Sequence, residues 1–199
     1  GDKTILTETI GDVTVQKRLE QAMDFLLKQR FEKKYGLLWG ATTADWGDVQ
    51  PEHDWGVVLD SNSHITIDIY DNAMFVIAIN DFLNMANLPA KDQKYWKGVK
   101  NSFAENIRKY LWDVKQQKFI PHIYLNGSPF PASFNESEVY YHGGTAIAIE
   151  AGLLSKKEVQ YAYKKMQDNV KKANASTIGL TLYPVYPQGY FKNGRMRPY

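Results

Sequence analysis

The sequence predicts an all-α fold, an (α/α) toroid built from helical hairpins. Segments with helical periodicity follow one another along the chain, and one-faced amphipathic segments alternate with segments that are apolar on all sides. Long aromatic-rich segments (32–64, 113–139 and 174–199) interrupt this alternation. An ordinary helical bundle is the alternative, but a bundle does not need three aromatic-rich loops on one face.

The first hairpins follow from the spacing of apolar residues. Val15, Leu19, Met23 and Leu26 share one face of a segment over roughly 14–31, which predicts an outer, half-exposed helix. Residues 66–86 include the run 73–79, which is apolar all round and is typical of an inner helix surrounded by others.

The later helices carry start and stop signals. Asn87 and Pro89 separate the inner helix from an amphipathic one whose apolar face carries Trp96, Val99, Phe103, Ile107 and Tyr110. A helix of small residues over 145–150 stops at Gly152, and Ser155 with Glu158 forms a capping box. The last helix has its apolar face at Val159, Ala162, Met166, Val170 and Ala173.

Helices joined by short turns run antiparallel, so all three long segments should lie at the same end of the fold. We expect residues 1–199 to form a single domain or fragment, partial relative to a full six-hairpin barrel, because the chain ends where a third inner helix would be due. The missing C-terminal hairpins, or an oligomer, would complete the ring.

Composition narrows the function classes. Apolar residues make up 44% and charged residues 23%, with no apolar run of about 18 residues that could cross a membrane. The net charge is +2 and the lysines are dispersed, which argues against nucleic acid as a partner. The absence of cysteine suits the cytoplasm and a bacterial periplasm equally, so the compartment stays open.

The first long segment combines indoles with carboxylates. Aromatic residues form 14% of the chain, and Asp45-Trp46-Gly47-Asp48 places an indole between two acids. Sugars present apolar faces and a rim of hydroxyls, which suit aromatic platforms beside carboxylates. The expected partner is therefore an oligosaccharide or glycoside, and the candidate contacts here are Trp39, Trp46, Asp48, His53 and Trp55.

Glycoside hydrolysis needs a carboxylic acid and a second carboxylate across the scissile bond. Asp45 is the candidate acid, although loop aspartates often only cap turns. Asp71 and Asn72 share a face with Asp68 at the start of the inner helix. The helix dipole accounts for Asp68, whereas Asp71 and Asn72, directly before the apolar run, indicate a ligand.

The second long segment repeats this chemistry. Glu136 is a second candidate catalytic carboxylate, and further candidate sugar contacts are His122, Glu138, Tyr141 and His142. Gly143-Gly144 could offer free amides to an anion, but we favour close helix packing. The four histidines are dispersed, and no phosphate-binding motif is present, so we expect neither a metal nor a cofactor.

These motifs resemble those of the six-hairpin glycosidases, a superfamily of glucosidases, debranching enzymes, rhamnosidases and sugar phosphorylases. The resemblance rests on 36–48, on the inner helix from Asp71, and on 140–155. In the cellobiose phosphorylase branch a similar Asp-Trp-Asn-Asp element supplies the general acid, which supports Asp45. This chain has Gly47 where that element has Asn, which would allow a change of role to substrate binding.

Three functions follow as hypotheses. The first is an exo-acting, inverting, glucosidase-like glycoside hydrolase that uses Asp45 with Asp71 or a loop glutamate. The second is a non-catalytic carbohydrate-binding fragment, which keeps the platforms without a spaced second carboxylate. The third is a polysaccharide lyase, which would want more arginines than Arg195 and Arg197 in the long segments.

Overall fold

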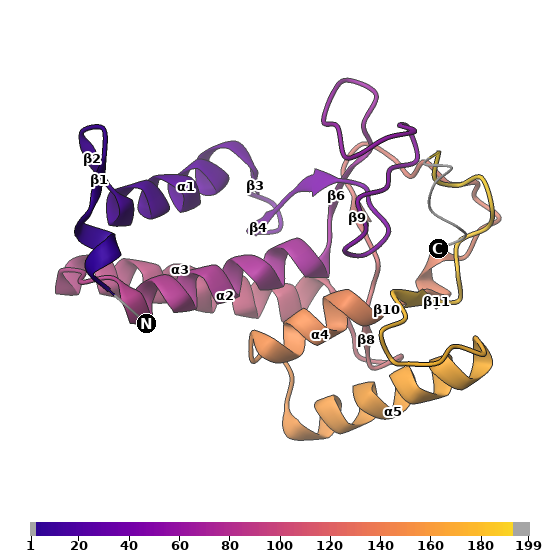
Figure 1. The fold of residues 1–199 in the computed structure, drawn as a ribbon. Helices are drawn as coiled ribbons and strands as arrows, with labels where there is room; N and C mark the ends of the chain where they lie inside the picture. The colour runs from indigo at the N-terminus through magenta and orange to yellow at the C-terminus, as the bar shows by residue number, and fades with distance from the viewer. Residues whose placement is uncertain (1–2, 193–199) are drawn as a thin grey trace.

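The fold is mixed α+β. The computed structural model describes residues 3–192, and within that range five α-helices and two 3-10 turns accompany eleven short strands in five small antiparallel sheets (Figure 1). The structure is 45% helical and 13% strand. The prediction of an all-α toroid is therefore wrong. Each strand is only two or three residues long, too short to show the alternation by which strands are found in a sequence.

The helices themselves lie where periodicity placed them, within a few residues at each end. They are α1 (Val15–Gln29), α2 (Ile69–Met85), α3 (Ala90–Tyr110), α4 (His142–Glu150) and α5 (Lys156–Lys172). A 3-10 turn (η1, Thr4–Thr7) and the β1–β2 hairpin (Thr9–Ile10, Val13–Thr14) precede α1, and the Thr14 side chain caps it by accepting from the Lys17 amide. The Ser155–Glu158 capping box of α5 is confirmed.

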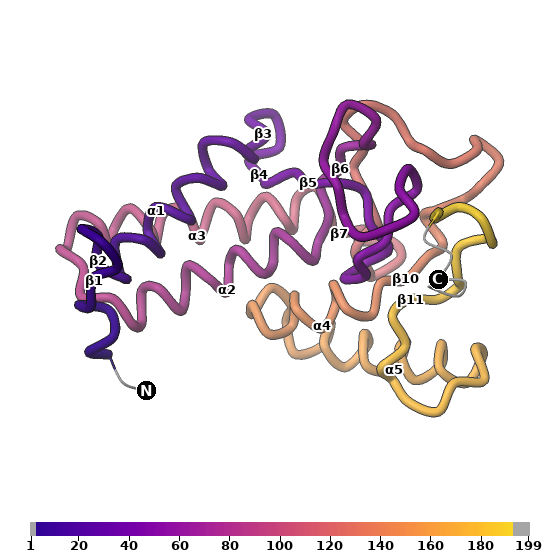
Figure 2. The backbone as a smooth tube through the Cα atoms, turned by 45° about the horizontal axis from the view of Figure 1, so that its top comes forward, coloured from indigo at the N-terminus to yellow at the C-terminus, as the bar shows by residue number. Residues whose placement is uncertain are grey.

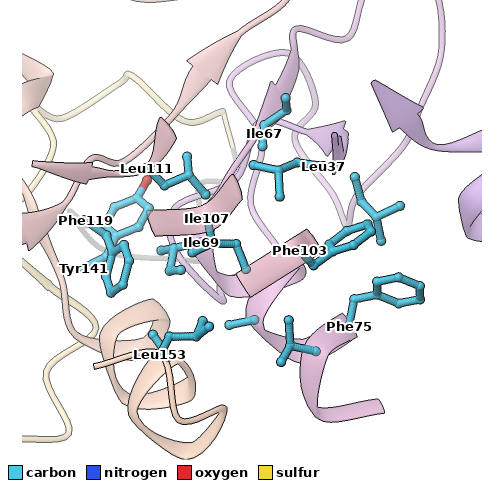
Figure 3. Close-up of a cluster of buried hydrophobic side chains, with 14 of the residues drawn as sticks. Leu37, Ile67, Ile69, Phe75, Phe103, Ile107, Leu111, Phe119, Tyr141 and Leu153 are labelled. Atoms are coloured by element: carbon cyan, nitrogen blue, oxygen red, sulfur yellow. The ribbon is translucent and has the colours of Figure 1, made fainter. Parts of the chain in front are cut away.

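Helices α2 and α3 form the central antiparallel hairpin. Phe75 lies edge-on to Phe103 with ring centroids 4.9 Å apart, and Phe82 lies edge-on to Trp96 at 6.0 Å. The two helices run side by side in both views (Figures 1 and 2). Figure 3 shows the buried cluster that this hairpin shares with the neighbouring strands and α4, including Ile69, Ile107, Leu111, Phe119, Tyr141 and Leu153.

One face of α2 remains open to solvent. Ile69, Ala73 and Ile79 are fully buried, but Met74 is 41% exposed on the side towards α1. The prediction that this helix is surrounded by others therefore fails on that side. A groove follows from the open face, as described below.

The long segments meet at one end of the hairpins, as antiparallel helices require (Figure 1). Strand β6 (Ile65–Ile67) pairs with β5 (Gly40–Ala41) and with β9 (Ile123–Tyr124), so the first and second segments share a sheet. Strand β10 (Tyr140–Tyr141) pairs with β11 (Leu182–Tyr183) of the third. The hairpins β3–β4 (Phe31–Glu32, Leu37–Leu38) and β7–β8 (Trp112–Asp113, Lys118–Phe119) extend α1 and α3, and a short 3-10 turn, η2, spans Glu136–Glu138.

Asn72 joins the first segment to α2. Its side chain is fully buried and accepts from the Leu38 amide at 2.8 Å, while its own amide donates to the carbonyls of Leu38 (3.0 Å) and Asp68 (2.8 Å). Asn72 was expected to contact sugar, but these bonds use the amide group internally. Its position before the apolar run is explained by the need to satisfy backbone groups in the core.

We predict that Asn72→Leu lowers the free energy of unfolding by about 2–4 kcal/mol, because it leaves the amide and carbonyl of Leu38 buried without partners. Urea denaturation followed by circular dichroism measures the change. Asn84→Leu, at an exposed position of the same helix, is the matched control and should change stability by less than about 0.5 kcal/mol. Equal effects of the two substitutions would contradict this role for Asn72.

Candidate functional site

Asp45 supplies the N-terminal cap of α4. The residue that directly precedes α4 is Tyr141, and its side chain makes no capping hydrogen bond. The Asp45 carboxylate fills this role from the first long segment: Oδ2 accepts from the Gly143 amide and Oδ1 from the Gly144 amide, each at 2.7 Å. Two orphan amides at the positive end of the helix dipole thereby gain hydrogen-bond acceptors.

Gly143 and Gly144 allow this approach because they lack a side chain. A Cβ on Gly143 would lie 2.3 Å from Cδ1 of Trp46, and a Cβ on Gly144 would lie 2.5 Å from Cγ2 of Ile69. The pair thus serves close packing, as we favoured. Its two amides are not free for a ligand, because both donate to Asp45 of the same chain.

Three carboxylates gather where α2 and α4 begin. Asp68 caps α2 by accepting from the Asp71 amide at 2.8 Å, and Gly144 packs against Ile69 of the same turn. Burial, followed by the charges of Asp71 and Asp45, raises the pKa of Asp68 well above its usual value. Carboxylates that repel one another in a poorly solvated place cannot all ionise together.

The carboxyl group of Asp45 has a pKa raised towards neutral pH. The residue is 5% exposed, and this burial raises its pKa from 3.8 to about 7, although the amides of Gly144 and Gly143 act in the opposite direction. Its backbone has the left-handed φ of 54°, which an aspartate tolerates better than most residues. A carboxyl group with such a pKa is suited to general acid catalysis.

Asp71 lies in the groove left by the open face of α2. The groove has a volume of about 430 Å³ and lies between α1 and α2, with Arg30, Trp39, Met74 and Phe75 among its lining residues. Asp71 as a whole residue is exposed, but its carboxyl group packs against the backbone, since a Cβ on Gly40 would lie 3.1 Å from Oδ2. Burial of the carboxyl group raises the pKa of Asp71.

Trp39 forms one wall of this groove. It is partly buried, and the guanidinium of Arg30 lies over its ring, 4.7 Å from the centroid. The groove therefore joins an aromatic surface, a cation and a carboxylate. Sequence reasoning missed Arg30, which looks like one more polar residue at the end of α1.

The remaining candidates of the first segment divide into exposed and partly buried residues. Trp46 is 52% exposed and Trp55 is 69% exposed, so both indoles are open to a ligand. Asp48 is also exposed. His53 is partly buried, with Nε2 3.6 Å from Oδ2 of Asp60.

Glu136, His122 and Tyr141 belong to a buried hydrogen-bond network. Glu136 accepts from the hydroxyls of Tyr186 (2.7 Å) and Tyr124 (2.8 Å), and lies 2.8 Å from Nδ1 of His122. Burial alone would raise the pKa of Glu136, but the hydrogen bonds and charge of His122, with those of Tyr186 and Tyr124, outweigh it and lower the pKa. Glu136 is thus suited to remain ionised.

Tyr124 and Tyr186 were also missed, since neither lies in a motif. Tyr186 comes from the third long segment, and its hydroxyl lies 2.9 Å from that of Tyr141. Only the meeting of the three segments brings these groups together. Aromatic richness in all three segments was the one signal in the sequence.

His142 and Glu138 lie elsewhere. His142 is 3% exposed, and its Nε2 lies 3.1 Å from the side-chain amide nitrogen of Asn169 on α5, so it joins the last two helices. Glu138 is exposed and accepts from the side chain of Asn135. Arg195 and Arg197 lie outside the described residues.

In the described range, no group of three or more histidine, aspartate or glutamate side chains is arranged to hold a metal ion. No helix of that range is long and apolar enough to cross a membrane.

No known family model matches the sequence, and no curated protein matches it. The resemblance to the six-hairpin glycosidases is therefore without support from family comparison. The fold that it implied is contradicted, because short antiparallel sheets join the long segments where an all-helical toroid was expected. The case for function rests on the site alone.

The raised pKa of Asp45 predicts a stability change with pH. A folded-state pKa of about 7 against 3.8 means that the folded protein binds the proton more tightly, so stability is lost as pH rises from about 4 to about 7. We expect the wild type to lose about 2–4 kcal/mol relative to Asp45→Asn over this range.

Urea denaturation of both proteins at pH values across this range measures the difference. Asp81→Asn, at an exposed position of α2, gives the baseline for loss of one carboxylate. A wild-type stability that rises relative to Asp45→Asn over the same interval would show that Asp45 is ionised more easily in the folded state.

Proposed function

We propose that this chain is a carbohydrate-active enzyme, a glycoside hydrolase in which Asp45 is the general acid and Asp71 the partner carboxylate. The observation that carries the proposal is the carboxyl group of Asp45, whose pKa is raised to about 7. It belongs to a cluster of acids at the adjoining N-termini of α2 and α4.

Mutual repulsion within the cluster supports a division of roles. Because Asp68 feels the charges of both Asp71 and Asp45, ionisation of one acid favours retention of the proton on another. A mixed state with one protonated and one ionised carboxyl is what acid–base cleavage of a glycoside needs. In the reaction proposed, Asp45 gives its proton to the leaving oxygen, and ionised Asp71 takes a proton from the attacking water.

The surroundings of the cluster suit a sugar. Trp46 follows Asp45 directly and is exposed, while Trp39 and Arg30 line the groove that contains Asp71. Flat aromatic surfaces cover the apolar faces of sugar rings, and carboxylates accept from their hydroxyls. Substrate would approach beside Trp46, the exposed indole next to Asp45 in the sequence.

A second candidate is non-catalytic carbohydrate binding, which one observation favours. Both oxygens of Asp45 already accept backbone amides at 2.7 Å, so capping alone accounts for its place. In that case the indoles and Asp71 bind sugar without turnover.

Turnover of nitrophenyl glycosides and short oligosaccharides by the wild type, Asp45→Asn, Asp71→Asn and Asp81→Asn distinguishes the two candidates. We expect the wild type to hydrolyse at least one substrate, and Asp45→Asn to lose about 10²- to 10⁴-fold in kcat through loss of acid catalysis. Asp81 lies about 15 Å from Asp71 along α2, so Asp81→Asn should retain full activity. Sugar binding by calorimetry without turnover in any of the four proteins would establish the non-catalytic candidate.

The pH profile gives an independent check of the acid. Since Asp45 must be protonated to act, kcat should fall about tenfold per pH unit above its pKa of about 7. Steady-state rates on the best substrate between pH 5 and about 9 provide the profile. An alkaline limb that persists unchanged in the residual activity of Asp45→Asn would assign the acid to another group.

A further inference from the structure

The His122 ring bridges two segments of the chain. The side chain is buried, with Nε2 3.0 Å from the carbonyl oxygen of Thr43 and Nδ1 2.8 Å from Oε1 of Glu136. Because a carbonyl oxygen only accepts, Nε2 carries a proton and donates it to Thr43. Nδ1 contacts both Glu136 and the hydroxyl of Tyr124, which lies 3.1 Å away.

Neighbouring hydroxyl groups complete the hydrogen bonding around His122 and Glu136. The hydroxyls of Tyr124 and Tyr186 donate to Glu136, and the hydroxyl of Tyr141 lies 3.3 Å from both Nε2 of His122 and the Thr43 carbonyl oxygen. Lys118 adds a positive charge that acts on Glu136 from β8, although its own ammonium donates to the Val139 carbonyl. A network so fully paired in a buried place rigidifies what it touches.

This network contacts the turn that carries Asp45. Thr43 lies two residues before Asp45, and its hydroxyl donates to the Asp45 carbonyl at 3.0 Å. The Thr43 carbonyl therefore accepts a hydrogen bond from His122, and the hydroxyl of Tyr141 lies beside it. Asp45 has a left-handed φ of 54°, and these contacts hold its backbone in that conformation.

We propose that His122 is a positioning residue: held at Nδ1 by Glu136, it donates from Nε2 to the Thr43 carbonyl and fixes the turn that orients the Asp45 carboxylate. The kinetic consequence rests on the proposed function. The hydrogen bond and the geometry of the turn do not, and they can be measured without any substrate.

The hydrogen bond is tested by nitrogen NMR of the protein labelled at histidine. The Nε2 signal of His122, assigned by its loss in His122→Gln, should show an attached proton in the wild type, because its partner, the Thr43 carbonyl oxygen, can only accept. An Nε2 without a proton in the folded wild type would overturn the proposal.

The geometry is tested with two variants that each keep one half of the histidine. The amide nitrogen of His122→Gln reaches roughly the position of Nε2 and can still donate to Thr43, whereas that of His122→Asn corresponds to Nδ1 and reaches only Glu136. The amide proton shifts of Gly143 and Gly144, which report the Asp45 carboxylate, should stay near wild type in His122→Gln and move upfield in His122→Asn.

The same pair separates positioning from general stability. On any glycoside that the wild type hydrolyses, His122→Asn should lose up to about 10²-fold in kcat with little change in KM, because a catalytic group displaced by about 1 Å loses that much. His122→Gln should retain most of the rate. Equal losses, or the reverse order in the amide shifts, would show that the pair only stabilises the fold, and a wild type without turnover would refute the proposed function while leaving the NMR result to decide this one.

Discussion

The contact between the Asp45 carboxylate and the amides of Gly143 and Gly144 is the constraint on which this end of the molecule depends. The carboxylate oxygens accept from two amides that lie 98 and 99 positions further along the chain, and each hydrogen bond is 2.7 Å long. Through Gly144 it also sets how closely α4 approaches Ile69 at the start of α2. Without this carboxylate, the first turn of α4 would keep unsatisfied amides in a buried place.

Two helix N-termini brought this close place like partial charges side by side. Carboxylates offset such partial positive charges, and Asp45 and Asp68 each cap one of the two helices. Their burial costs solvation, and the raised pKa values of both groups are the measure of that cost. The same arrangement thus serves the fold and leaves a carboxyl group able to exchange a proton near neutral pH. Structural capping and acid catalysis are compatible readings of one interaction.

The second network is built differently. Around Glu136, two hydroxyl groups and an imidazole form hydrogen bonds with the carboxylate, and these bonds lower the pKa of Glu136 below its usual value. The molecule therefore contains one group of acids held towards the neutral form and one acid held as an anion, joined by the short turn from Thr43 to Asp45. Environments that separate the pKa values of carboxylates are typical of catalytic sites.

The sequence by itself determined the helices. Apolar periodicity and capping signals such as Ser155 with Glu158 are local, so they act before any tertiary contact forms. It also indicated that Asp45, Asp71 and Trp46 belong to one end of the fold, since antiparallel helices carry their long connections there.

Only the tertiary structure decided the strands and the tasks of single residues. A two-residue strand such as β5 exists because β6 happens to lie beside it, and no periodicity can reveal so short a pairing. Asn72 and His142 look like ligand contacts in the sequence, yet burial turns their polar groups inwards to backbone and to Asn169. The role of a polar side chain depends on which partner lies within about 3 Å, and that depends on how distant segments pack.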